Sequence, residues 1–340
     1  MNAALPGIRG LFQQRVSGDD ALLRLTRLRF SQTGMPAELY ADTPDELDEL
    51  LGYVPDHQTP PTVHLNRRVD LLQEHGRALV SDFAARFAGR VSGLVVHDQV
   101  SMLHRTPELV AALRQVGDRS DGPFVFLEYA ARLPLDWFAD VAHAVAGVQR
   151  SSVCVDIGHV GLAEVRRRLA EQDGRAAAVR LGDPDLADQA DRVQQATGLG
   201  LPAVLALVAQ LGALGKTLHL HLHDGHPAVP GLSDHFSFLT RFPVPFGYQG
   251  ARSLPPLFGP AGLAAILHQA LDSCGPQRLS LTLEIHQAEG RLPLDAEAVA
   301  LFGHWADLTN AERLNYWLSV IADNQVLASS LLRARQRPPG

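Results

Sequence analysis

Cysteine and lysine are both scarce in this chain of 340 residues. The two cysteines, Cys154 and Cys274, are too few for a disulfide framework and suit a reducing compartment. Lys216 is the only lysine, and it is predicted to lie at the start of a strand. Barrel enzymes place their chemistry at the opposite ends of their strands, so we set aside Schiff-base chemistry on lysine.

Other familiar signals are also missing. The N-terminus lacks a basic stretch followed by an apolar segment, so we expect no secretion signal and a cytoplasmic location. No run approaches 18 uninterrupted apolar residues, which argues against a membrane-spanning helix. The formal net charge is -7, and no basic face dominates, so a nucleic-acid partner is not expected. A hydrophobic fraction of 46% is typical of a globular protein.

Short apolar runs alternate with longer amphipathic stretches, the pattern of a parallel sheet with crossover helices. We predict one α/β domain over residues 1–340, folded as a (β/α)8 TIM barrel. Its core spans about residues 7–290, and a helical extension follows at 291–335. Eight segments are predicted as strands: Gly7–Phe12, Ala37–Ala41, Thr62–Leu65, Gly93–His97, Phe124–Glu128, Val153–Asp156, Thr217–His223 and Leu281–His286.

Helix signals follow the strands. Thr43 and Glu46 are spaced as the two ends of a capping box, with Pro44 between them at the first helical position. Two or three helices are expected between the sixth and seventh strands. The stretch 224–260 is too long for a plain connection and is predicted to form a lid or binding loop. Further helices are predicted at 70–88, 135–148, 161–170 and within 296–335.

In the segment Thr217–His223, leucine alternates with histidine after the first residue. Successive side chains of a strand point to opposite faces, so the leucines would meet the helices and the histidines would point into the barrel. Buried imidazoles are costly unless a hydrogen bond or a metal ion satisfies them. We therefore expect the histidines nearest the C-terminal end of this strand to act as ligands.

The same test finds acids and histidines at other strand ends. Any one of them taken alone more often caps a helix or makes a structural hydrogen bond, but their coincidence predicts a metal site. Imidazole together with carboxylate suits zinc, manganese, iron or cobalt. Six strand ends carry such residues: His64, His97, Glu128, Asp156 with His159, His221 with His223, and Glu284 with His286.

These residues resemble the xylose-isomerase-like barrel superfamily, which includes sugar isomerases, epimerases and the endonuclease IV family. The matching pieces lie in the same order over roughly residues 35–290: Val63 to Asn66, Leu94 to His97, Phe126 to Glu128, Val155 to His159, His221 to Asp224, and Leu283 with Glu284. The resemblance to epimerases implies one divalent ion, two glutamates that move protons, and a substrate contact at His159. The implied ligands of that ion are Glu128, Asp156, His221 and Glu284.

The resemblance to endonuclease IV implies a site of up to three ions, in which His64, His97 and an Asp-x-His after the seventh strand take part. An iron-dependent group that oxidises peptide cysteines has a similar ligand set. This chain departs from that pattern, because it offers Asp224-Gly225-His226 and then Ser233-Asp234-His235. We expect Asp234 and His235 to be ligands, with His235 favoured over His226. The residues expected on the substrate side are His223, Asp224 and His226.

Three functions stay open. The first, which the acidic pI favours, is a divalent-metal-dependent isomerase or epimerase of a small hydroxy-carbonyl compound, with Glu128 and Glu284 on opposite sides of the reacting carbon. The second is a multinuclear enzyme, either a phosphoesterase or an iron-dependent oxidase. The third is a non-catalytic binding barrel. One to three divalent ions, a small-molecule substrate and, by analogy with similar barrels, a homodimer complete the expectation.

Overall fold

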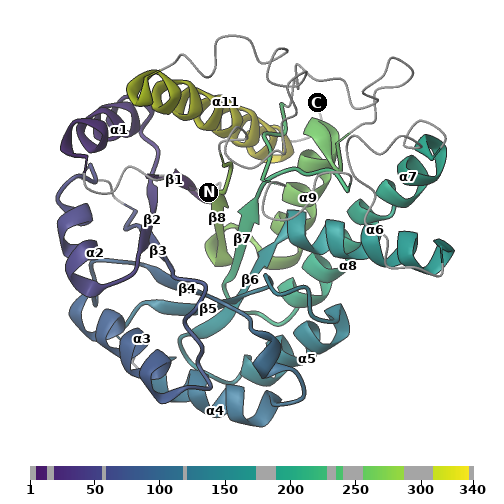
Figure 1. The fold of residues 1–340 in the computed structure, drawn as a ribbon, viewed down its shortest axis with the longest axis horizontal. Coiled ribbons are helices and arrows are strands. Elements are labelled where there is room, and N and C mark those ends of the chain that lie inside the picture. The colour runs from purple at the N-terminus through teal and green to yellow at the C-terminus, as the bar shows by residue number, and fades with distance from the viewer. Residues whose placement is uncertain are drawn as a thin grey trace.

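The computed structural model describes residues 5–13, 19–55, 59–117, 121–173, 189–227, 235–239, 256–286 and 309–336. Within them, eight parallel strands pair in chain order and close into a barrel, with helices around it (Figure 1). This architecture confirms the predicted (β/α)8 fold. The strands are β1 (Ile8–Leu11), β2 (Ala37–Ala41), β3 (Thr62–Leu65), β4 (Gly93–His97), β5 (Phe124–Glu128), β6 (Ser151–Asp156), β7 (Leu218–Leu222) and β8 (Leu279–Leu283).

Four strands, β2 to β5, have the predicted bounds, and the others differ at their ends. The largest difference is in β8, which ends at Leu283 instead of His286. Glu284 and His286 therefore leave the barrel on the segment that follows the strand. There the backbone N–H of His286 donates to the carbonyl of His235 at 3.1 Å, instead of joining a strand ladder.

The helices form a ring outside the strands (Figure 1). They are α1 (Asp20–Thr33), α2 (Pro44–Leu51), α3 (Glu74–Arg86), α4 (Thr106–Gly117), α5 (Leu135–Val145), α6 (Ile157–Asp173), α7 (Ala190–Thr197), α8 (Gly200–Gly212), α9 (Gly259–Cys274) and α11 (Asn310–Gln336), with short 3-10 turns η1 (Val100–Met102) and η3 (Pro276–Arg278). The C-terminal helix α11 packs against α1, α9 and β1. The C-terminal helix therefore packs beside the first strand and the first helix of the barrel.

Local chemistry explains where two of these helices begin. The hydroxyl of Thr43 accepts a hydrogen bond from the Glu46 backbone at 3.2 Å, which confirms the predicted cap of α2. Helix α3 starts at Glu74, later than predicted. The carboxylate of Asp70 accepts from the Leu72 backbone at 2.8 Å and holds a turn where a helix was expected.

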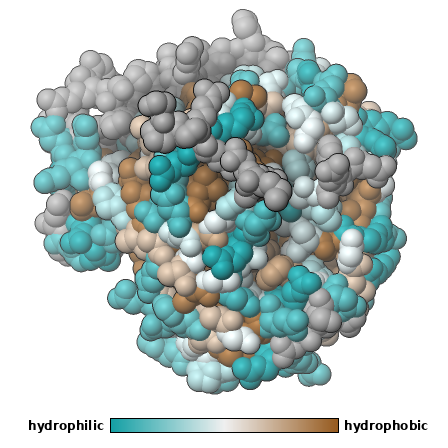
Figure 2. Space-filling model, turned by 180° about the vertical axis from the view of Figure 1, so that it is seen from behind, coloured by the Kyte–Doolittle hydropathy of each residue, from teal (hydrophilic) through white to brown (hydrophobic). Residues whose placement is uncertain are grey.

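The main hydrophobic core lies between the strands and the helices. Leu218, Leu220 and Leu222 of β7 belong to it, as their alternation with histidine predicts. A second, small apolar cluster of Val95, Phe126 and Cys154 lies inside the barrel. On the face shown in Figure 2, hydrophilic side chains occupy most of the outline and hydrophobic ones appear in smaller groups between them.

One stretch, Asp191–Gly212, is long and apolar enough by composition to cross a membrane, and 44% of its apolar 18-residue window is buried in the fold. Its second part, α8, packs against α6 and α9 in the ring of helices. This position accounts for its apolar character.

Candidate metal centre

The register of the strands brings the predicted ligands side by side. His97 of β4 pairs with Glu128 of β5, and Asp156 of β6 pairs with His221 of β7. Because all strands are parallel, their carboxyl ends meet at one rim. The side chains that the sequence places at six strand ends therefore converge on one cluster, which is buried except for the partly exposed His97 and His286.

The first part of the cluster, here called the Glu128 group, contains His64, His97 and Glu128. Three atoms form a small triangle: His64 Nε2 lies 2.9 Å from Glu128 Oε2 and 3.2 Å from His97 Nε2, and His97 Nε2 lies 3.2 Å from Glu128 Oε2. A tetrahedral zinc site with bonds of about 2.0–2.1 Å has edges of about 3.3 Å. The triangle therefore has the size of one face of a metal coordination shell.

The hydrogen bond on the far side of His64 fixes which nitrogen faces the group. His64 Nδ1 lies 3.1 Å from the carbonyl oxygen of Leu65, so Nδ1 donates that hydrogen bond and Nε2 is the nitrogen that faces Glu128. Glu128 Oε2 faces this nitrogen and Nε2 of His97. Buried imidazole nitrogen and carboxylate oxygen atoms that converge in this way are satisfied by protons or by a metal ion, and the donor set of the Glu128 group fits a divalent metal ion.

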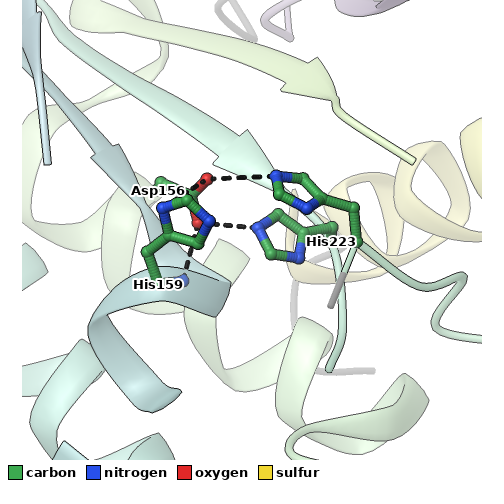
Figure 3. A group of neighbouring side chains, drawn as sticks. Asp156, His159 and His223 are labelled. Carbon is green, nitrogen blue, oxygen red and sulfur yellow. Dashed lines mark hydrogen bonds and ion pairs between the residues drawn. The ribbon is translucent and has the colours of Figure 1, made fainter. Parts of the chain in front are cut away.

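The second part, the Asp156 group, contains Asp156, His159, His223 and His235. Figure 3 shows Asp156 at the end of its strand facing the rings of His159 and His223. His223 Nε2 lies 2.7 Å from Asp156 Oδ1, and its Nδ1 lies 2.9 Å from the carbonyl oxygen of Asp224. The imidazole is oriented as in the Glu128 group, with a backbone carbonyl behind it and a carboxylate in front.

Glu284 and His221 lie between the two groups. His221 Nδ1 is 2.8 Å from Glu284 Oε2 and 3.3 Å from Glu128 Oε1. Glu284 Oε2 is also 3.8 Å from His235 Nε2, and Tyr40 donates its hydroxyl to Glu284 Oε1 at 2.5 Å. One carboxylate thus contacts both halves of the cluster, and the halves form one continuous centre.

Burial and charge act in opposite directions on these groups. Burial alone would raise the pKa of Glu128, but the charges of His97, His64 and His221 hold it well below its usual range. Burial would lower the pKa of His64, whereas the charge of Glu128 and a hydrogen bond to it raise that pKa. The pKa of His221 is likewise raised by neighbouring anionic groups against burial. Protons on imidazole balance the buried acids here, and a divalent ion would replace those protons.

A cavity of about 590 Å³ opens onto the centre. Glu128, Glu284, His159 and His235 are among the residues at its inner wall. Arg67 and Arg68, directly after β3, lie at its outer part, and both are exposed. The cavity is large enough for a small-molecule substrate.

Three residues that the sequence assigns to the loop after β7 are placed differently or fall outside the described residues. Asp234 is outside them. Asp224 accepts hydrogen bonds from the backbone of Gly225, Phe258 and Gly259 at 2.7–3.0 Å, so its geometry indicates a structural role rather than the predicted substrate contact. His226 is buried, and burial lowers its pKa to about 3, so its imidazole is neutral. His223, expected on the substrate side, lies within the Asp156 group.

The sequence reasoning missed Tyr40 and Glu38, which share the inner face of β2. Tyr40 lies beside His64 in the strand register, and Glu38 lies one layer deeper. The alternation test applied to Ala37–Ala41 finds both residues, because Ala37, Leu39 and Ala41 occupy the outer face.

No protein-family model matches the chain, and no curated protein matches it. Ten chains of solved structures match. One is a crystal structure of an amidohydrolase from Burkholderia multivorans with bound zinc. It is 14% identical, the match covers 95% of this chain and 99% of that chain, and the TM-score is 0.41. Similarity at this level gives no information on the activity of the present protein.

Two expectations are corrected. The expected assignment to the xylose-isomerase-like superfamily is wrong: the solved structure described above is that of an amidohydrolase. The isomerase or epimerase reading is also wrong. It implies a single divalent ion, whereas the donor atoms form two groups, one around Glu128 and one around Asp156. What remains is a barrel with a buried cluster of histidine, aspartate and glutamate suited to divalent metal.

Proposed function

We propose that this protein is a metal-dependent hydrolase with more than one metal ion, acting on a small anionic substrate. The observation that carries the proposal is the division of the cluster into two groups of donor atoms, joined through Glu284 and His221. A single ion with four ligands would leave the imidazoles and carboxylates of the other group buried without a metal ion to coordinate. Divalent ions in both groups would polarise the scissile bond and lower the pKa of the attacking water.

The residues of this chain have separable roles in such a reaction. Glu284 contacts both groups and keeps them at a fixed spacing. Tyr40 lies at the cavity wall, and burial together with the charge of Glu284 raises its pKa well above the usual value, so it keeps its proton. It therefore serves as a hydrogen-bond donor. His286, 3.5 Å from both Glu284 Oε1 and the Tyr40 hydroxyl, is placed to accept a proton at the same wall.

The outer part of the cavity supports an anionic substrate. Within the described part of the chain, neither the Arg67 nor the Arg68 guanidinium makes an ion pair or a side-chain hydrogen bond. The acids nearby are engaged: Asp42 accepts from the Asn66 amide at 2.9 Å, and Glu46 accepts from the Asp42 backbone at 2.8 Å. Two uncommitted positive charges beside a metal centre suit a phosphate or carboxylate group.

Replacing both arginines, Arg67→Gln with Arg68→Gln, is expected to raise KM for an anionic ester about 10-fold, which corresponds to about 1.4 kcal/mol. The KM for a neutral ester should stay unchanged, because only the charged group loses its partners. Steady-state kinetics on the two esters measures the difference. Arg24→Gln, which breaks an exposed pair with Asp20, is the matched control. Equal effects on both esters would contradict an anion-binding role.

The function is tested by removing metal with a chelator and reloading the protein, without oxygen, with zinc, manganese or iron. We expect two or three ions per chain by elemental analysis. Hydrolysis of bis(4-nitrophenyl) phosphate, 4-nitrophenyl phosphate or 4-nitrophenyl acetate should appear on reloading and disappear with chelator. A single ion per chain with no hydrolysis in any loaded form would overturn the proposal. Oxygen consumption by the iron-loaded protein alone would replace it with an oxidase.

A further inference from the structure

A line of polar side chains, buried except for the partly buried Ser280, runs through the inside of the barrel beneath the metal centre. We call it the lumen column and define it as Arg9, Ser280, His219, Glu38 and His221. Arg9 donates to the hydroxyl of Ser280 at 2.9 Å, Ser280 Oγ lies 2.8 Å from His219 Nδ1, and His219 Nε2 lies 3.2 Å from Glu38 Oε2. Glu38 Oε1 then lies 3.0 Å from His221 Nε2.

The hydrogen bonds of the lumen column all run in the same direction, from Arg9 toward Glu38. Because Arg9 donates to Ser280, the serine hydroxyl proton is available for His219 Nδ1, and the His219 proton then sits on Nε2, toward Glu38. Thr62 and Thr282 also donate to Glu38 Oε2, at 2.6 and 2.9 Å. Glu38 is the common acceptor of the column.

The other oxygen of Glu38 is left for His221. Glu38 Oε1 faces His221 Nε2 at 3.0 Å, and the buried Cys154 also lies close to His221. A carboxylate at this position keeps the His221 proton on Nε2. His221 Nδ1 then presents its lone pair toward Glu128 and Glu284.

We infer that Glu38 is a positioning residue for the metal centre, holding His221 in the tautomer and orientation in which Nδ1 faces the ions. It is completely buried and lies on the inner face of β2, below the rim. His219, Thr62 and Thr282 hold the carboxylate of Glu38 through its other oxygen, Oε2. A carboxylate bonded to a ligating imidazole also raises the basicity of the nitrogen that faces the metal. The inference rests on the metal centre of the proposed function, but not on the reaction.

The experiment compares metal-free wild type with Glu38→Ala and Glu38→Gln. Each is titrated with Co²⁺ alone, followed by visible absorption, and with Zn²⁺ against a competing chelator. We expect the alanine variant to bind about 10- to 100-fold more weakly, with altered Co²⁺ absorption bands. Glutamine keeps a carbonyl acceptor for His221 but loses the charge, so its affinity should fall between those of wild type and the alanine variant.

Val63→Ala is the control for general destabilisation. Val63 is buried against the helices, on the face of β3 opposite His64, and its truncation should lower the free energy of unfolding without changing the Co²⁺ spectrum. Wild-type affinity and spectrum in Glu38→Ala would overturn the inference; if that variant does not fold, wild-type values in Glu38→Gln would do so. Wild type that binds no Co²⁺ overturns the metal centre and this inference together. Wild type that binds Co²⁺ but hydrolyses nothing overturns only the proposed reaction.

Discussion

His64→Ala and Asp156→Ala are each expected to lose bound metal and to lower kcat/KM by more than about 100-fold. Removing a residue that merely supports a ligand already costs about 10- to 100-fold, and these two residues supply the donor atoms themselves. His64 belongs to the Glu128 group and Asp156 to the Asp156 group. Each variant should therefore lose an ion from its own group and keep metal in the other. Elemental analysis and steady-state kinetics on the same preparations measure both effects.

His75→Ala provides the matched control, because His75 is an exposed histidine on α3 outside the barrel. It should keep the wild-type metal content and activity. If His64→Ala retained full activity and full metal content, the Glu128 group would not be part of the centre. The site would then reduce to the Asp156 group, and the multinuclear proposal would fail.

The fold was predictable because its signal is local. Alternating apolar residues mark the strands, and four of eight strands have the predicted bounds. The inner face of β7 could be assigned from Leu218, Leu220 and Leu222 alone, since a strand has only two faces. The same rule predicts that histidines and acids meet at one rim of the barrel.

The division of that rim into two groups was not predictable. His221 and His223 are two residues apart, yet His221 faces Glu284 and Glu128 whereas His223 faces Asp156. The difference depends on the register of β7 against its neighbours and on where each strand ends. Both are properties of the closed barrel, and no local pattern encodes them.

The activity was less predictable from the sequence than the fold or the site residues. The resemblance to isomerases depended on residue types at strand ends, and many chemistries use the same types at the same ends of a barrel. It assigned Glu128 and Glu284 to opposite sides of a substrate carbon. It also assigned both acids to one ion, and their common contact with His221 Nδ1 agrees with one centre but does not identify the reaction.

Gly158→Ala is expected to disable the Asp156 group while leaving the barrel folded. Gly158 is the second residue of α6. A Cβ atom at this position would lie 1.9 Å from Cε1 of His223, 2.4 Å from its Nδ1 and 2.6 Å from its Nε2. Carbon atoms in contact are normally about 3.5–4.0 Å apart, so either the ring or the start of the helix must move.

The ring of His223 is restrained by contacts at both nitrogens and on one face. Its two nitrogens contact the Asp224 carbonyl and the Asp156 carboxylate, and its face stacks on His235 with ring centroids 4.0 Å apart. Any movement that accommodates a methyl group breaks at least one of these contacts. We therefore expect loss of the ion in the Asp156 group and a loss of about 1–3 kcal/mol in the free energy of unfolding, the usual cost of overpacking.

Gly147→Ala is the matched control, because a Cβ atom there meets nothing within 4 Å. It should keep the metal content, activity and stability of the wild type. Metal content by elemental analysis and unfolding in urea are measured for both variants. A Gly158→Ala protein with the full complement of ions at wild-type affinity would show that His223 is not held in this position when metal is bound, and His223 would then have to be removed from the ligand set. Loss of metal in Gly158→Ala alone would instead explain why glycine follows Asp156 and Ile157 at this turn: the ligand ring occupies the space of a side chain.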